Sequence, residues 1–334
     1  MRLVLKHIGK LLLTEHEPAP WVAGEEMASV NCLSNAWLAI EHENIACFGE
    51  GEVIPFPDDE VLDCKGGMVM PAFCDSHTHL VYAGSREQEY EDKIRGLSYE
   101  EIAKRGGGIL NSAKLLSETS EDELFEQSLS RAREIIQTGT GAVEIKSGYG
   151  LNIADELKML RVIKRLAGET ELTIRSTFLG AHAVPASFKE DQDNYVRLVI
   201  EEMIPAVAQE DLADYIDVFC DRGFFTVEQT ASILEAGAKY GLVPKIHANA
   251  LDYSGGVQVG VRHHARSVDH LEFVGEDEIA VLKESTTMPT ILPGASLFLG
   301  MSYAPARNMI ESGLPVALAS DYNPGSSPSG NMEL

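Results

Sequence analysis

Short apolar segments alternate with longer amphipathic ones from Gly67 to Leu334. Eight apolar segments lie at residues 68–75, 141–147, 172–180, 215–221, 242–248, 266–272, 287–292 and 314–321. Short apolar runs bounded by polar and turn-forming residues predict buried strands. Most of the segments between them have the length and spacing of helices. Eight strands alternating with helices over residues 67–334 predict an α/β fold, a (β/α)8 TIM-like barrel.

One intervening segment, residues 121–137, carries clear helix signals. Its apolar side chains recur at helical spacing at Phe125, Leu129, Ala132 and Ile136. Ser120 and Glu123 form the pattern of a capping box at its start, and Gly139 stands where a C-terminal cap belongs. The pattern therefore predicts a helix with an apolar face toward the core.

The first part of the chain, residues 1–66, has a different pattern. Short β-type runs at residues 3–8, 36–43 and 45–51 are separated by Gly, Pro and Asn, without a convincing helical period. We expect a small antiparallel β-sandwich unit there, followed by the barrel over residues 67–334. A doubly wound open sheet is the alternative to the barrel, but no G-x-G-x-x-G or P-loop follows its first strand.

Charge and cysteine content narrow the class of protein. The chain has 334 residues, with 27 Lys and Arg against 52 Asp and Glu, so its formal net charge is −25. This argues against nucleic acid and anionic membranes as partners, because both need a basic face. No apolar run approaches the ~20 residues of a membrane span. Five scattered cysteines without a C-x-x-C pair suit a reducing cytoplasm, where we expect the protein.

Histidines gather at the predicted strand ends. Asp75-Ser-His77-Thr-His79 ends the first barrel strand, and alternate residues of an extended segment point the same way. The other strand ends carry His182, His247, His270 and, on the last strand, Asp321. One such histidine is commonly a hydrogen-bonded loop residue, but barrel chemistry lies at the C-terminal strand ends. A set of three histidines and an aspartate suits zinc or a similar metal, which lowers the pKa of bound water to roughly 7. Metal-assisted hydrolysis is predicted, with deamination as its close variant.

Other residues fall where a substrate would lie. Arg86, in the first loop after a barrel strand, can hold a carboxylate bidentately, unless it is a surface arginine paired with a nearby glutamate. Tyr149 can donate a hydrogen bond or simply pack over the barrel mouth. The backbone amides of Asn323-Pro-Gly325-Ser326 can form an anion nest, although this composition also favours a plain turn.

Several longer phrases resemble one known family. They are D-S-H-T-H-L, S-R-E, R-G-G-G-I, E-I-K-S-G-Y-G-L, T-F-L-G-A-H-A-V-P, S-V-D-H-L-E, L-P-G-A-S-x-F-L-G and S-D-Y-N-P-G-S-S-P. The H-x-H and the final aspartate are typical of the amidohydrolase superfamily as a whole. K-S-G-Y-G, F-L-G-A-H-A-V-P and D-Y-N-P-G-S are more specific and resemble the imidazolonepropionases within it. The resemblance runs from the first strands to the last residue.

The resemblance implies an activity and a set of roles. The activity is hydrolysis of the ring C–N bond of 4-imidazolone-5-propanoate to N-formimidoyl-L-glutamate in histidine degradation, by a metal-bound hydroxide. One zinc or iron ion would be bound by His77, His79, His247 and Asp321, with His270 and Asp321 acting in catalysis. The substrate-binding residues would be Arg86, Tyr149, His182, Asn323, Gly325 and Ser326, with Tyr99 at the border of the site. The expected partner is this small anionic substrate, and a homodimer stays open.

Two features depart from the family pattern. The family commonly has a glutamate proton shuttle three residues after the strand-five histidine, where this chain has Ala250. A general acid–base residue contributes ~10²–10⁴-fold, so either the enzyme is slow or Asp321, His270 and water suffice. Family members also continue through a closing helix and further strands, so we expect the last helix and the C-terminal part of the small β unit to be absent, leaving that composite domain incomplete.

Two other functions stay open on the sequence alone. One is a related aminohydrolase that deaminates a heterocyclic amine, although Arg86 and the loop at 323–326 favour a substrate with a carboxylate. The other is a metal- or ligand-binding relative that has lost catalysis, which Ala250 and the missing closing elements would explain.

Overall fold

The computed structural model describes residues 2–15, 17, 19–97 and 107–334. Tyr99 and the first two residues of the R-G-G-G-I phrase, Arg105 and Gly106, lie outside the described residues. The chain divides into two compact units, Met1–Ala72 and Phe73–Leu334. Within the described residues, no helix is both long and apolar enough to cross a membrane.

The first unit is a small sheet around one long strand. Its elements are β1 (Arg2–Leu12), a 3-10 turn η1 (Gly24–Ala28), β2 (Cys32–Glu41), β3 (Asn44–Glu50), β4 (Glu60–Asp63) and β5 (Met68–Val69). The order is β3-β2-β1-β4, and β5 also pairs with β1. β2 runs antiparallel to β1 and β3, whereas β4 and β5 run parallel to β1, so the sheet is mixed rather than purely antiparallel. A small core of Ile8, Leu11, Ala36 and Leu38 holds it together.

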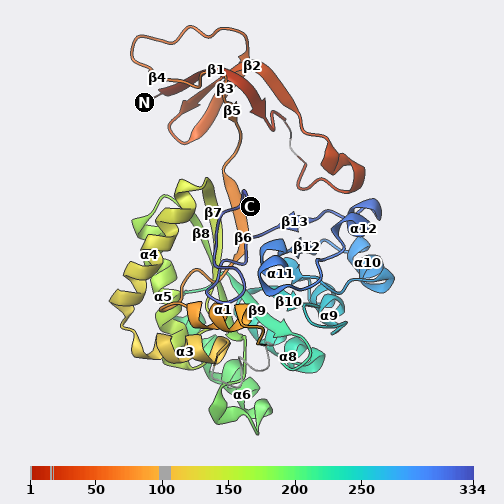
Figure 1. Ribbon diagram of the computed structural model, residues 1–334. Coiled ribbons are helices and arrows are strands. Elements are labelled where there is room, and N and C mark those ends of the chain that lie inside the picture. The colour runs from red at the N-terminus through yellow and green to blue at the C-terminus, as the bar shows by residue number, and fades with distance from the viewer. Residues whose placement is uncertain (1, 16, 18, 98–106) are drawn as a thin grey trace. The chain divides into compact units, whose positions relative to one another are not determined.

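The second unit contains the eight parallel strands that the apolar segments predict (Figure 1). They are β6 (Phe73–Thr78), β7 (Thr140–Lys146), β8 (Thr173–Ala181), β9 (Tyr215–Cys220), β10 (Val243–Ala248), β11 (Ser267–His270), β12 (Met288–Ile291) and β13 (Ala317–Leu318). The first predicted strand, residues 68–75, differs most. Its start, Met68 and Val69, pairs with β1 in the other sheet, and the barrel strand begins only at Phe73.

Backbone bonds join the two ends of this sheet into a nearly closed barrel. The strands follow each other in sequence order from β6 to β13. The Asp321 N–H donates to the His77 carbonyl at 3.0 Å, and the His79 N–H donates to the Tyr322 carbonyl at 2.9 Å. The closing contact therefore lies at the C-terminal ends of the strands and involves three of the predicted site residues.

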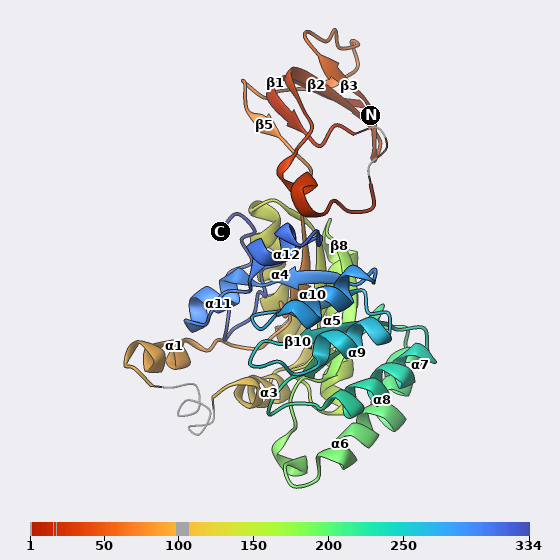
Figure 2. The same cartoon turned by 90° about the vertical axis from the view of Figure 1, so that its right-hand side faces the viewer.

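Helices cover the outside of the barrel (Figures 1 and 2). They are α1 (Glu87–Ile94), α3 (Ile109–Glu118), α4 (Glu121–Gln137), α5 (Ile153–Glu169), η2 (Ala186–Phe188), α6 (Gln192–Leu198), η3 (Val199–Met203), α7 (Ile204–Gln209), α8 (Val227–Ala238), α9 (Gly256–Arg262), α10 (Glu276–Lys283), α11 (Pro293–Leu299) and α12 (Ala306–Glu311). Helix α4 has the bounds and the capping box expected from the sequence. Its buried face includes Ile135 in place of Ile136, which is 36% exposed.

Candidate metal and active site

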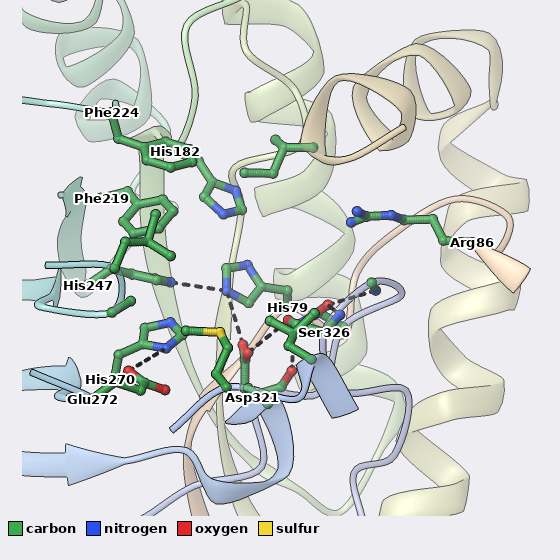
Figure 3. Close-up of a pocket in the computed structure, with 18 of the residues that line it drawn as sticks. His79, Arg86, His182, Phe219, Phe224, His247, His270, Glu272, Asp321 and Ser326 are labelled. Carbon is green, nitrogen blue, oxygen red and sulfur yellow. Dashed lines mark hydrogen bonds and ion pairs between the residues drawn. The ribbon is translucent and has the colours of Figure 1, made fainter. Parts of the chain in front are cut away.

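Three histidines converge at the C-terminal end of the barrel, and Figure 3 shows two of them, His79 and His247. His77 lies in β6, His79 follows that strand, and His247 lies in β10. One ring nitrogen of each lies within 4.8 Å of the others, and the Nε2 atoms of His79 and His247 are 3.3 Å apart. Asp321 Oδ1 lies 3.6 Å from His77 Nε2 and 3.7 Å from His79 Nε2. The four predicted ligands thus form one cluster.

Carboxylates behind the cluster orient two of the rings. His77 Nδ1 lies 2.7 Å from Asp269 Oδ2, and His247 Nδ1 lies 2.9 Å from Asp217 Oδ2. A carboxylate can only accept, so His77 Nδ1 donates to Asp269 and His77 Nε2 presents its lone pair to the cluster. The buried Lys146 ammonium lies 2.9 Å from Asp217 and offsets part of this negative charge.

The cluster suits a metal ion by its chemistry. His77 Nε2 is fully buried and has no hydrogen-bond partner among the described residues. Burial lowers the pKa of His77 and His79 well below the usual range, so both imidazoles are neutral. Neutral, converging nitrogens beside a carboxylate form the donor set that zinc and related ions bind.

A cavity of about 480 Å³ opens above the cluster. The predicted site residues that line it are His79, Arg86, Tyr149, His182, His247, His270, Asp321, Asn323, Gly325 and Ser326. His77 lies beneath it, fully buried. The structure therefore brings together every expected site residue that it describes, although they come from six different strands and the loops that follow them.

The loop after β7 is held by one buried carboxylate. Glu156 is fully buried in α5 and accepts hydrogen bonds of 2.8–3.1 Å from three backbone N–H groups of residues 148–151. His182 Nδ1 donates at 3.0 Å to the Gly148 carbonyl, and burial lowers the pKa of His182 to about 3. Glu156 thus fixes both Tyr149 and the neutral tautomer of His182.

Arg86 is anchored at the cavity wall. Its side chain is 8% exposed, and Nε and Nη2 donate to Glu89 Oε2 at 3.0 and 2.7 Å. Glu89 Oε1 accepts from the Gly108 N–H at 2.9 Å. A Cβ on Gly325 would come within 2.2 Å of Arg86 Nη1, so the position has no room for a side chain. Pairing with Glu89 therefore holds the guanidinium inside the cavity rather than on the surface.

The 323–326 segment forms a side-chain-stabilised turn. Asn323 Oδ1 accepts from the backbone N–H groups of Gly325 at 2.8 Å and Ser326 at 2.7 Å. These two amides are therefore engaged within the turn, and an anion that bound them would displace Asn323. Ser326 Oγ donates to Asp321 Oδ2 at 3.0 Å, which orients the aspartate toward the histidines.

His270 faces a carboxylate that the sequence analysis did not single out. Glu272 Oε2 lies 3.7 Å from His270 Nδ1. Burial lowers the pKa of His270, but Glu272, Asp321 and Asp269 outweigh it and raise the pKa to about 9. Ala250 lines the same cavity and is 3% exposed.

The sequence analysis missed four of the carboxylates that support the site, namely Glu156, Asp217, Asp269 and Glu272, and considered Glu89 only as the partner of a surface Arg86. A signal exists for two of the four, because Asp217 in Y-I-D-V-F-C-D and Asp269 in S-V-D-H-L-E interrupt otherwise apolar strand segments. A charged residue within a buried strand needs a partner there. The other two, Glu156 in a helix and Glu272 in a loop, lie where an acidic residue is ordinary.

Known relatives match the entire chain. It is 53% identical over 335 residues to the imidazolonepropionases of Christiangramia forsetii and Flavobacterium johnsoniae, covering 100% of this chain and 82% of each relative. The chain belongs to the imidazolonepropionase family. An imidazolonepropionase of Geobacillus kaustophilus is 42% identical over 338 residues, covering 99% of this chain and 80% of that relative. No protein-family model matches the chain.

Solved structures share the fold of this imidazolonepropionase family member. An E. coli guanine deaminase matches with a TM-score of 0.71 at 13% identity, covering 99% of this chain and 75% of that one. An atrazine chlorohydrolase from Arthrobacter aurescens TC1, complexed with zinc and atraton, matches with a TM-score of 0.67 at 13% identity, covering 98% and 74%. At such low identity these likenesses establish the fold alone.

Proposed function

We propose that the chain hydrolyses the ring C–N bond of 4-imidazolone-5-propanoate and forms N-formimidoyl-L-glutamate, as a step of histidine degradation. The main support is the 53% identity to imidazolonepropionases over the full chain. The cavity agrees with that substrate, because the Arg86 guanidinium and the histidine cluster border the same space. A cavity of about 480 Å³ is ample for a five-membered ring with a propionate arm.

One zinc or iron ion would be held by His77, His79, His247 and Asp321. Such an ion polarises a carbonyl and lowers the pKa of water when it is bound. Support comes from the converging ring nitrogens of the three histidines and from the zinc named with the atrazine chlorohydrolase neighbour.

The chain's own residues then bind and move protons. Arg86 would pair with the propionate, and Tyr149 and His182 would hold the ring. His270, protonated on Nδ1 beside Glu272, would donate a hydrogen bond from Nε2 to the carbonyl oxygen as negative charge develops there. Asp321 Oδ1 would accept a proton from the attacking water. Asn323, Gly325 and Ser326 would border the glutamate end of the product.

Turnover of freshly prepared 4-imidazolone-5-propanoate tests the activity. We expect loss of imidazolone absorbance with formation of N-formimidoyl-L-glutamate and without ammonia. Release of ammonia from a heterocyclic amine, with the imidazolone left intact, would instead identify a deaminase. Bound metal without turnover of any substrate would indicate a protein that has lost catalysis.

The variant His247→Ala tests the metal assignment. It removes one of three converging nitrogens, so bound metal and turnover should both be lost. His263→Ala is the matched control, because His263 follows α9 and does not line the cavity. Full activity of His247→Ala would overturn the assignment.

A further inference from the structure

Glu272 follows β11 in an unusual backbone conformation. His270 and Leu271, the two residues before it, have φ of 89° and 67°, which non-glycine residues rarely adopt. Leu271 N–H donates to the Ala248 carbonyl at 3.2 Å, and Phe273 N–H donates to the Asn249 carbonyl at 2.9 Å. These bonds hold the segment against the end of β10 and place Glu272 in the cavity wall. Such strain at a site is commonly tied to function.

The two carboxylate oxygens of Glu272 have different surroundings. Oε1 accepts from Ser296 Oγ of α11 at 2.9 Å. Oε2 is buried and has no hydrogen-bond partner among the described residues, and the His270 ring lies 3.7 Å away (Figure 3). The side chain is 2% exposed. A buried carboxylate oxygen without a hydrogen bond is costly, so its retention at a cavity points to a ligand or a proton.

The other acidic residues on the described cavity wall are already engaged. Glu89 uses one oxygen on Arg86 and the other on Gly108. Asp321 Oδ2 accepts from Ser326, and Oδ1 faces His77 and His79. Ala250, on the same wall, carries no proton. Glu272 is thus the lining carboxylate whose second oxygen accepts no hydrogen bond from the described residues and has only the His270 ring beside it, at 3.7 Å.

We propose that Glu272 is a catalytic acid–base residue of the hydrolysis, an inference that rests on the proposed function. A C–O bond forms between water and the ring carbonyl carbon, and the C–N bond breaks with its electron pair on nitrogen. Water loses one proton and the leaving nitrogen gains one. The Glu272 carboxylate, receiving the proton directly or from Asp321, delivers it to that nitrogen, and the other water proton ends on the new carboxyl group.

The test compares variants in the metal-loaded full chain. Glu272→Gln keeps the shape and can still accept from Ser296, whereas Glu272→Ala opens space for added formate. Glu276→Gln, an exposed change at the start of α10, is the control. Bound metal, kcat and KM are measured for each on 4-imidazolone-5-propanoate, with and without formate. Lack of turnover by the unaltered chain would contradict the proposed function itself. A difference between the variants and the unaltered chain tests only the role of Glu272.

We expect Glu272→Gln and Glu272→Ala to lower kcat ~100-fold or more, with bound metal unchanged and KM altered less than threefold. Formate should raise kcat of Glu272→Ala at least tenfold and leave the control unaffected. If Glu272→Ala does not fold, kcat of Glu272→Gln decides alone. A kcat within threefold of the unaltered chain would overturn the proposal. So would a low kcat that formate does not raise, since Glu272 would then only position His270.

Discussion

The Arg86 side chain is held in place by its neighbours at the cavity wall. Its guanidinium is held on one edge by Glu89, and Gly325 leaves room beside it. The side chain is therefore largely immobilised before a substrate arrives, which lowers the entropy cost of binding. A lysine cannot reproduce this arrangement, because its single ammonium group lacks the planar fork.

Arg86→Lys should therefore raise KM for 4-imidazolone-5-propanoate roughly 10–100-fold, the equivalent of ~1.5–3 kcal/mol for a charge-assisted hydrogen bond. The methyl ester of the substrate, which lacks the carboxylate, should bind the variant and the unaltered chain alike. Steady-state kinetics on both compounds measure the difference. Arg222→Lys is the control, since that side chain is 72% exposed and pairs only with Asp252 among the described residues. Equal losses on acid and ester would show that Arg86 does not read the carboxylate.

Some residues of the site could be predicted from the sequence and others could not. The convergence of His77, His79 and His247 could be predicted because strand ends and alternation fix the direction of their side chains. Glu272 could not, because its place in the cavity depends on two left-handed residues and on Ser296 from another helix. The hydrogen bonds from the Gly325 and Ser326 amides to Asn323 could not be predicted either, since an anion nest and a plain turn have the same composition.

At the scale of elements, helix α4 depends on its first turn. The Ser120 side chain accepts from the Glu123 N–H, and Glu123 accepts from the Ser120 N–H. Ser120→Ala should lower the free energy of unfolding by ~1 kcal/mol, because the Glu123 backbone N–H at the start of α4 then loses its acceptor. Thermal melting should show a decrease in Tm of a few degrees. Ser117→Ala, an exposed change on α3, should leave Tm nearly unchanged. A Tm equal to that of the unaltered chain would show that the cap adds nothing here.

The ends of an element can be predicted when local sequence signals determine them, as in α4. They cannot be predicted when pairing with a distant strand determines them, as in β5. The box at Ser120 and the glycine at 139 give α4 its bounds from local chemistry alone. In contrast, nothing local separates Met68 and Val69 from the barrel strand that follows. They belong to the small sheet because β1 offers them an edge, a contact between residues nearly 60 positions apart. The parallel pairing of β4 and β5 with β1 cannot be predicted from the sequence either, because it also depends on contacts between distant residues.

At the scale of the whole molecule, a net charge of −25 coexists with a site for an anion. The barrel concentrates acidic residues behind the cluster, where Asp217 and Asp269 are balanced by Lys146 and Lys245. Local positive charge at the cavity comes from Arg86, and the proposed metal ion would add to it. The metal is thus expected to serve both binding and stability.

Removing the metal with a chelator should abolish turnover and lower Tm, because an ion that binds only the folded state stabilises it. At a free concentration ~100 times its dissociation constant, the stabilisation is ~2.7 kcal/mol. Re-addition of zinc or iron should restore both quantities, and the ion that restores more activity identifies the better cofactor. The control is His247→Ala, whose Tm should no longer respond to chelator. An unchanged Tm and rate after verified metal removal would contradict a resident ion.

Because Asp321 takes part in closing the barrel, the site can form only at a late stage of folding. Asp75 binds Ser320, 245 positions later, and the neighbouring bonds join His77 and His79 to the segment 321–322. During synthesis the first two ligands leave the ribosome long before the last, and the ring cannot close until both ends of the sheet exist. Closing so long a loop carries a large entropic cost. The cluster therefore assembles late, so the ligand set is completed only when the barrel is nearly finished.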